Sequence, residues 1–277
     1  MSETPDVDQD LLARIENQVL WLTINRPDAG NAITPAVRNR IIEHMHDAST
    51  NWRVRAVVLT AAGEKHFCTG ADLRAGGVVM PERPEGAPDS IVGDGARTIR
   101  EGIQRLTASI ADCEKPVICA LNGTAAGGGA SMMLACDLVI AADTAKMIQV
   151  FVRRGLIPDG GSVYYLPRLT SLQKAKELVF FGDDLTAAEA ERIGVVNKVV
   201  PAAELEATAR AWAERLAEGP TKTIGFAKRL LNRSPDQDRA TMFEEESFLV
   251  ELVTRTGDSA EGVASFRERR PTEFKGW

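Results

Sequence analysis

Two apolar segments, separated by a glycine-rich turn, lie in the run PVICALNGTAAGGGASMMLACDLVIA at residues 116–141. Residues 116–121 are continuously apolar, as strands are when a sheet is covered on both faces. Glycine-rich residues 122–131 follow and lead into a short apolar helix at 132–135. A second apolar strand is predicted at 136–141. This order of strand, helix and strand predicts an α/β fold with a largely parallel sheet at its core.

The same pattern extends in both directions along the chain. Further strands are predicted at 20–25, 55–60 and 195–200. Thr34 and Pro35 open a helix with one apolar face, because four apolar residues recur at helical spacing. These residues are Val37, Ile41, Met45 and Ala48.

Two other regions differ from this alternation. Residues 74–97 contain five Gly and three Pro with no helical or strand period. This composition favours a long mobile flap that covers a site. A tolerated insertion is the alternative. After residue 202 the sequence is almost purely helical, and its first helix carries an apolar stripe. The stripe is Leu205, Ala209, Trp212 and Leu216. It could dock on the chain's own core or on a partner subunit.

Composition limits the classes of function. The 277 residues include 33 Lys and Arg against 39 Asp and Glu, so the net charge of −6 argues against a nucleic-acid partner. No apolar run approaches the roughly 18 residues that a membrane span needs. The acidic start, MSETPDVDQD, lacks the features of a secretory signal and is expected to be a frayed tail, which suggests a cytoplasmic protein. Four cysteines without a CxxC pair and only three histidines do not predict a metal site.

Three segments could carry chemistry. In FCTGADL at 67–73, the small residues Gly70 and Ala71 allow a backbone to approach a ligand closely, although a structural turn has the same composition. The glycines of 122–131 precede a helix whose first N–H groups are free, which suits a backbone oxyanion hole. Tight helix packing would also explain them.

The third segment is GLIPDGG at 155–161, where Asp159 stands alone among apolar residues and glycines. Pro-Asp-Gly is common in turns and helix caps. A partly buried Asp with a raised pKa would instead suit proton transfer. The segment by itself leaves both interpretations open.

The three segments, in this order and spacing, resemble the enoyl-CoA hydratase/isomerase family, also called the crotonase family. Further similar motifs are NRP at 25–27, LTAAEAERIGVVNKVV at 185–200 and EGVASFRERRPTEF at 261–274. The resemblance implies a spiral of ββα units over 12–201 after a flexible tail at 1–11. It also implies a C-terminal helical trimerisation region at 202–277, and homotrimers or hexamers.

The resemblance further implies an acyl-CoA thioester as substrate, so that coenzyme A belongs to the substrate and no separate cofactor is expected. The backbone N–H groups of Ala71 and Gly128 would polarise the thioester carbonyl. Hydratases of the family carry two glutamates, and those positions fall here on Ser131 and Phe151. Neither side chain can transfer a proton as a carboxylate does, which is a serious objection to water addition.

Asp159 matches the carboxylate of dienoyl-CoA isomerases and of the ring-opening isomerases of phenylacetate degradation, to which GLIPDGG is most similar. One carboxylate suffices for moving a double bond, so an acyl-CoA isomerase is the leading hypothesis. A hydratase that uses Asp159 with a water held by Ser131 or by a peptide group is the alternative. A non-catalytic acyl-CoA-binding scaffold is a second alternative.

The resemblance also places substrate-binding residues. Arg26 and Arg269 match basic positions near the phosphates of coenzyme A, with Arg269 reaching them in the same or in a neighbouring subunit. The alternative for each is a solvated surface charge. Other expected substrate contacts are Ala32, Asp72, Leu73, Gly127, Ser131 and Phe151. Arg153 and Arg154 are neighbours, so at most one can face the site, and neither is assigned.

Overall fold

The computed structural model describes residues 7–72, 84–88 and 91–277. A six-stranded sheet forms its centre, with strand order β1-β2-β3-β5-β7-β10. All neighbouring strands of this sheet run parallel except β1 and β2, which form an antiparallel pair. Its strands are β1 (Leu11–Glu16), β2 (Val19–Ile24), β3 (Ala56–Ala61), β5 (Val117–Leu121), β7 (Leu138–Ala142) and β10 (Lys198–Val200).

A second, smaller sheet has the order β4-β6-β8-β9, with only β9 antiparallel to its neighbour. Its strands are β4 (His66–Cys68), β6 (Thr124–Ala126), β8 (Lys146–Ile148) and β9 (Asp184–Thr186). The chain visits the large sheet, then the small sheet, then a helix, and repeats. The expected spiral of ββα units followed by a C-terminal helical region is therefore confirmed.

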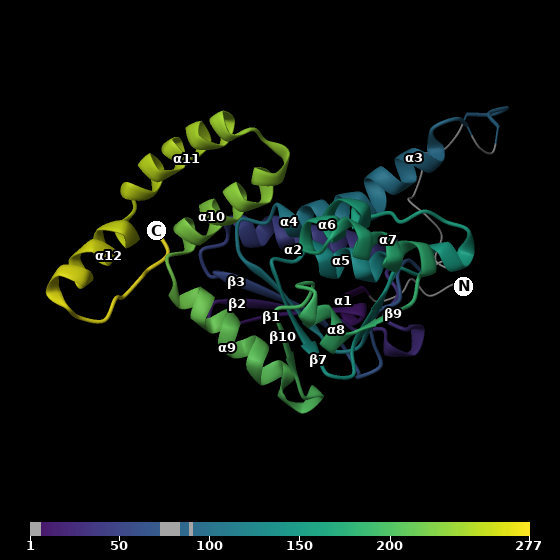
Figure 1. Cartoon of the computed structure of the whole chain (residues 1–277), viewed down its shortest axis with the longest axis horizontal. Helices are drawn as coiled ribbons and strands as arrows, with labels where there is room; N and C mark the ends of the chain where they lie inside the picture. The colour runs from purple at the N-terminus through teal and green to yellow at the C-terminus, as the bar shows by residue number, and fades with distance from the viewer. Residues whose placement is uncertain (1–6, 73–83, 89–90) are drawn as a thin grey trace.

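Helices cover both faces of the large sheet (Figure 1). Helix α9 packs on β3, β5 and β7, while α2 packs on β1 and β2 and also on α4. The helices of the first half of the chain are α1 (Val7–Asp10), α2 (Pro35–Thr50), α3 (Asp94–Ile99), α4 (Arg105–Ala111) and α5 (Gly128–Ala135). Those of the second half are α6 (Ser162–Leu169), α7 (Leu172–Phe181), α8 (Ala187–Arg192), α9 (Leu205–Glu218), α10 (Thr221–Arg233), α11 (Arg239–Thr254) and α12 (Gly257–Glu268).

The apolar patterns of the sequence locate the core correctly. The four apolar residues predicted for one face of α2 are its buried residues, and the Thr34 hydroxyl caps the helix by accepting from the Val37 N–H. In α9, Leu205 and Ala209 are buried, and Trp212 and Leu216 pack partly buried against the same core. The stripe therefore docks on the chain's own sheet and not on a partner.

Two boundaries differ from the sequence-based prediction. Residues 7–11, assigned to the tail, form α1 and the first residue of β1, and Leu11 is buried. The strand β1 escapes prediction because its other residues are exposed on an edge, so its sequence LLARIE carries no clear alternation. Part of the predicted loop at 74–97 lies outside the described residues. Helix α3 begins at Asp94, near the end of that predicted loop.

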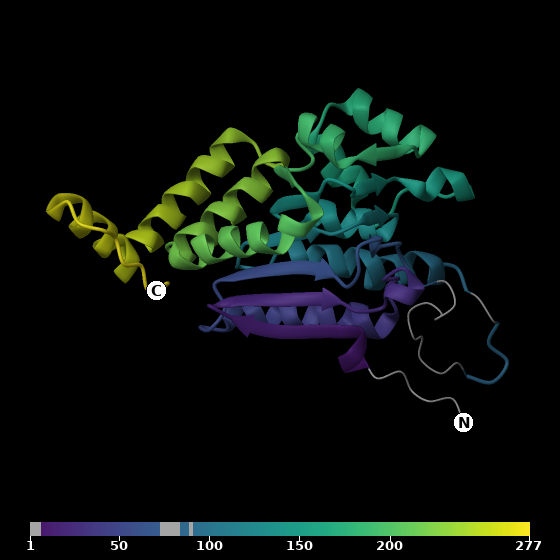
Figure 2. The same ribbon diagram turned by 90° about the horizontal axis from the view of Figure 1, so that it is seen from below.

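The last two helices project away from the rest of the molecule. Figures 1 and 2 show α11 and α12 as an arm that carries the C-terminus to the opposite end from α3. In the described part of the chain, no helix is both long and apolar enough to cross a membrane.

Candidate active site

A cavity of about 240 Å³ lies where the glycine segments meet. Gly70, Ala71, Gly127 and Gly128 line it together with Asp159, and we call it the glycine-lined cavity. Its other walls come from the start of α2, from the region between α3 and α4, and from the 3₁₀ turn η3 (Val150–Arg154). The three segments that the sequence analysis singled out therefore meet at one cavity.

Backbone geometry brings the loop after β4 against the start of α5. Gly70 has a φ of 104°, and a Cβ on it would lie 3.4 Å from the Gly128 nitrogen. The left-handed φ and the close approach both favour glycine here. The next residue, Ala71, makes a single bridge with Ile33, in which the bonds are made by the Gly70 carbonyl and the Asp72 N–H. The Ala71 N–H is therefore left over by the bridge.

The Gly128 N–H is the first of helix α5 and has no acceptor within the helix. Among the described residues, neither it nor the Ala71 N–H donates a hydrogen bond to another protein group. Two backbone donors on adjacent, rigid segments thus border one cavity. Such a pair can hold a carbonyl oxygen on which negative charge develops.

Asp159 lies in the turn between η3 and α6 and lines the same cavity. It is half-buried, and burial raises the pKa of its carboxyl group, against a smaller opposing contribution from a backbone hydrogen bond. It is the single acidic residue among the described residues that line the cavity. A carboxylate with a raised pKa is a stronger base than an ordinary aspartate.

Ser131 contacts the turn that holds Asp159 and does not line the cavity. Its hydroxyl is fully buried, donates to the Asp159 carbonyl oxygen at 2.9 Å, and lies 2.8 Å from the Ser162 hydroxyl. A Cβ on Gly160 would lie 2.9 Å from the Ser131 Cβ, so the turn occupies the space that a longer side chain at 131 would need. The expected substrate contact by Ser131 is therefore replaced by a contact with the Asp159 turn.

Phe151 does line the cavity, and its ring packs on Gly127, where a Cβ would lie 3.9 Å from the ring's Cζ. It gives the wall next to Asp159 an apolar surface. Gly127 has a φ of 53° and also lines the cavity. Both residues thus line the cavity, and their contact with a substrate stays a prediction.

The predicted phosphate-binding arginines do not line the cavity. The Arg26 guanidinium lies between two carboxylates, 3.1 Å from Asp10 and 3.1 Å from Asp72, and also donates to the Ala32 carbonyl. Arg26, Ala32 and Asp72 therefore form one cluster that braces the loop leading to Ala71. Leu73 lies outside the described residues.

Arg269 is exposed just after α12, with a left-handed φ of 57°. Figure 1 places the end of this arm far from α3 and α5, which border the glycine-lined cavity. Within one chain, Arg269 does not reach the site.

Two arginines that were not assigned do line the cavity, Arg38 on α2 and Arg154 at the end of η3. Arg153 turns away and pairs with Asp184 at 3.3 Å, which agrees with the expectation that at most one of the neighbours faces the site. Arg38 follows Val37 directly, so it lies on a different side of α2 from the buried apolar face. This spacing could have indicated that the Arg38 side chain points away from the core.

A matching family model, described as enoyl-CoA hydratase/isomerase, covers residues 14–277. The chain is 34% identical over 266 residues to the 1,2-epoxyphenylacetyl-CoA isomerase of Escherichia coli, covering 96% of this chain and 98% of that one. It is 35% identical over 262 residues to the short-chain-enoyl-CoA hydratase of Clostridium acetobutylicum, covering 93% and 94%. A solved enoyl-CoA hydratase from Bacillus anthracis superposes with a TM-score of 0.86 at 30% identity, covering 97% of this chain and 100% of that one.

Proposed function

The chain belongs to the enoyl-CoA hydratase/isomerase family, and we propose that it moves the double bond of an enoyl-CoA thioester by proton transfer through Asp159. The observation that carries this proposal is the site's acid–base content. Asp159 is the single carboxylate among the described residues lining the cavity, and it shares that cavity with two free backbone donors. Isomerisation needs one proton-carrying group, whereas water addition must both activate a water and deliver a proton.

The proposed reaction conserves all atoms. The thioester oxygen of a 3-enoyl-CoA accepts hydrogen bonds from the Ala71 and Gly128 N–H groups. Asp159 removes a proton from the α-carbon, and the electron pair moves onto the thioester oxygen to give a dienolate. The protonated Asp159 then returns the same proton to the γ-carbon, which leaves the double bond between the α- and β-carbons. Loss of one oxyanion donor raises such a barrier by about 3–4 kcal/mol.

The positions that carry glutamates in the family's hydratases support isomerisation over hydration. Ser131 is bonded to the Asp159 carbonyl and to Ser162, and Phe151 presents an apolar ring. A water activated by Ser131 would have to displace contacts that hold the Asp159 turn. Hydration with Asp159 as base stays the alternative, and similarity to relatives of both kinds agrees with either reaction.

The test is an assay in D₂O with a 3-enoyl-CoA and with crotonyl-CoA, read by mass spectrometry. We expect double-bond migration or deuterium uptake without a gain of water mass, and a loss of about 10²–10⁴-fold in rate for Asp159→Asn. Asp183→Asn, an exposed carboxylate outside the cavity, is the matched control and should react as the wild type does.

Other outcomes separate the alternatives. A gain of water on crotonyl-CoA that survives Asp159→Asn would contradict both the isomerase assignment and the role of Asp159. A gain of water that Asp159→Asn abolishes would identify a hydratase. Tight acyl-CoA binding without turnover of either substrate or of a bulkier thioester would identify a scaffold.

The coenzyme A end of the site is proposed to involve a second copy of the chain. Arg26 is already engaged by Asp10 and Asp72, so its role is to hold the Ala71 loop. Arg269 stands on the projecting arm and can approach a substrate only in a neighbouring chain. This agrees with the trimeric or hexameric assembly that the resemblance implies.

A further inference from the structure

Two cations that have no carboxylate partner among the described residues border the glycine-lined cavity. Arg38 and Arg154 both line it, and in the described part of the chain neither takes part in a salt bridge. Apolar side chains supply much of the remaining wall, among them Ile99, Ile103, Leu106 and Phe151. A cation beside apolar surface loses hydration, and this loss costs free energy unless an anion compensates it. A cavity that binds only a simple hydrocarbon chain would gain nothing from two guanidinium groups.

Arg38 is the less hydrated of the two. It is half-buried, whereas Arg154 is exposed. The Arg38 guanidinium donates to the neutral Oδ1 of Asn39, at 3.1 Å from both Nε and Nη2. Burial lowers the pKa of the Arg38 guanidinium, and the positive charge of Arg105 lowers it further. The local field therefore favours a negative group at this place.

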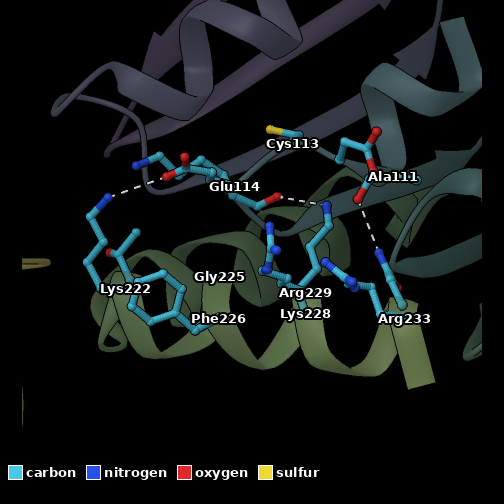
Figure 3. A pocket seen from close by; sticks show the side chains of 13 residues that line it. Ala111, Cys113, Glu114, Lys222, Gly225, Phe226, Lys228, Arg229 and Arg233 are labelled. Atoms are coloured by element: carbon cyan, nitrogen blue, oxygen red, sulfur yellow. Dashed lines mark hydrogen bonds and ion pairs between the residues drawn. The ribbon is translucent and has the colours of Figure 1, made fainter. Parts of the chain in front are cut away.

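A larger cavity elsewhere has basic side chains too, but most of them already have carboxylate partners, and Figure 3 shows one such pair, Lys222 with Glu114. This cavity of about 410 Å³ lies between α10 and the turn after α4. Lys222 pairs with Glu114 at 3.4 Å, Lys228 with Asp137 at 2.8 Å, and Arg229 with Glu245 at 2.9 Å. An anion there would have to displace these carboxylates, so the unpaired charges of the glycine-lined cavity are the more specific signal.

The size of the glycine-lined cavity indicates which part of a thioester fits it. Its volume of about 240 Å³ is below the roughly 300–1,000 Å³ of sites for drug-sized ligands. An acyl group of several carbons fits this volume, while the nucleotide of coenzyme A does not. The catalytic Asp159 and the two N–H donors already require the acyl end of the substrate to lie here.

We propose that the preferred acyl group carries a carboxylate at the end remote from the thioester, and that Arg38, assisted by Arg154, binds it. This inference rests on the proposed function, because it assumes that the acyl chain enters the cavity of Asp159. Arg38 and Arg154 are thus specificity-determining residues and take no part in proton transfer.

The test compares two 3-enoyl-CoA thioesters of equal chain length, one ending in a carboxylate and one in its methyl ester. In the wild type, kcat/KM is expected to favour the carboxylate by about tenfold or more. Arg38→Leu should bring this ratio to about one, Arg38→Lys should retain part of it, and Arg154→Leu should lower it less, because its exposed charge is screened. Arg192→Leu, an exposed arginine outside the cavity, is the control and should keep the wild-type ratio.

Equal kcat/KM values for the two thioesters in the wild type would overturn this inference and leave the isomerase proposal standing. If neither thioester isomerises, the proposed function fails, and calorimetric binding of the saturated pair tests the carboxylate preference without turnover. If Arg38→Leu binds free coenzyme A or dephospho-coenzyme A more weakly than the wild type does, the arginine belongs to the nucleotide site. That result would overturn the inference. Circular dichroism melting of each variant verifies that it is folded.

Discussion

Asp159 combines two opposing demands. Its carboxylate must be ionised to remove a proton, yet burial raises its pKa and so disfavours the ionised form. The turn that holds it is fixed by the Ser131 hydroxyl on its carbonyl and by two glycines with left-handed φ, Gly160 and Gly161. The site therefore keeps a destabilising charge in place, which is a common cost of activity.

Asp159→Asn is expected to raise thermal stability while it removes activity. A carboxyl group whose pKa is raised by folding stabilises the native state below the unfolded pKa, near 3.8, and this contribution is lost as pH rises through the folded pKa. At neutral pH the variant should therefore melt at a higher temperature than the wild type, and the difference should shrink in acid. Melting curves between about pH 4 and about pH 8 measure this.

The rate of the wild type should fall as pH drops through the same raised pKa, because only the carboxylate is a base. A pH–rate profile of kcat/KM with no acid limb above the ordinary aspartate range would contradict this role of Asp159. A variant that melts below the wild type at neutral pH would show that another group of the protein compensates the Asp159 carboxylate in the wild type.

At the scale of elements, the start of α5 depends on contact between two backbones. A Cβ at Gly129 would lie 2.1 Å from the Cys68 carbonyl oxygen, at the end of β4. Real Cβ atoms do not approach so closely, so any side chain would separate α5 from β4. The two free N–H groups stand on α5 and on the loop that follows β4, and the contact thus sets their relative position.

Gly129→Ala is expected to destabilise the fold by about 1–3 kcal/mol, as overpacking does in a dense core, and to lower kcat because the donors separate. Gly95→Ala is the matched control: it lies in α3, its added Cβ meets nothing within 4 Å, and its φ is not left-handed. That substitution should be neutral or stabilising by about 0.4–1 kcal/mol. Urea unfolding measures both, and equal stability of the two variants would refute the packing argument.

Helix α10 is tied to the large sheet by a shielded ion pair. Lys228, with its side chain 7% exposed, lies 2.8 Å from Asp137 and also donates to the carbonyls of Ile110 and Lys115. Burial raises the pKa of Asp137, and Lys228 opposes this shift. The pair joins α10 to the residue just before β7.

Lys228→Ala is expected to cost about 3–5 kcal/mol of unfolding free energy, because it leaves Asp137 shielded and unpaired. Lys222→Ala removes the exposed pair with Glu114, in the cavity between α10 and the turn after α4 (Figure 3). This substitution should cost at most about 1 kcal/mol of unfolding free energy. Denaturant titrations of the two variants measure the difference. A small, equal loss in both would indicate that water already reaches Asp137.

At the scale of the whole molecule, the projecting arm of α11 and α12 leaves large apolar side chains exposed. Helix α11 has no buried residue, although Phe243, Phe248 and Val250 lie on it, and Phe266 of α12 is 84% exposed. Isolated helices of this length are marginal in water. The arm is therefore expected to be covered by further copies of the chain.

Phe266→Glu should weaken this assembly, because a charge would be placed where an apolar ring is expected to be covered. Sedimentation equilibrium should show a trimer or hexamer for the wild type and a smaller species for the variant. Leu172→Glu, at an exposed apolar residue on α7 of the main body, is the control. A wild type that sediments as a monomer would refute the assembly and with it the proposed reach of Arg269.

The sequence by itself determined the strands of the large sheet except the edge strand β1, the buried face of α2, and the family. Each of these depends on local spacing, since apolar runs and helical periods are properties of neighbouring residues. The catalytic candidates were also predictable, because Ala71, Gly128 and Asp159 lie in distinctive motifs. The short strands β4, β6, β8 and β9 were not, because three residues carry no period.

Only the tertiary structure decided what the charged and polar side chains do. Arg26 matched a phosphate-binding position but is held by Asp10 and Asp72, while the unassigned Arg38 and Arg154 line the cavity. Ser131 matched a substrate position but supports the turn of Asp159. These roles depend on partners tens of residues away, and a long side chain's partner is set by the packing of whole elements, which local spacing does not encode.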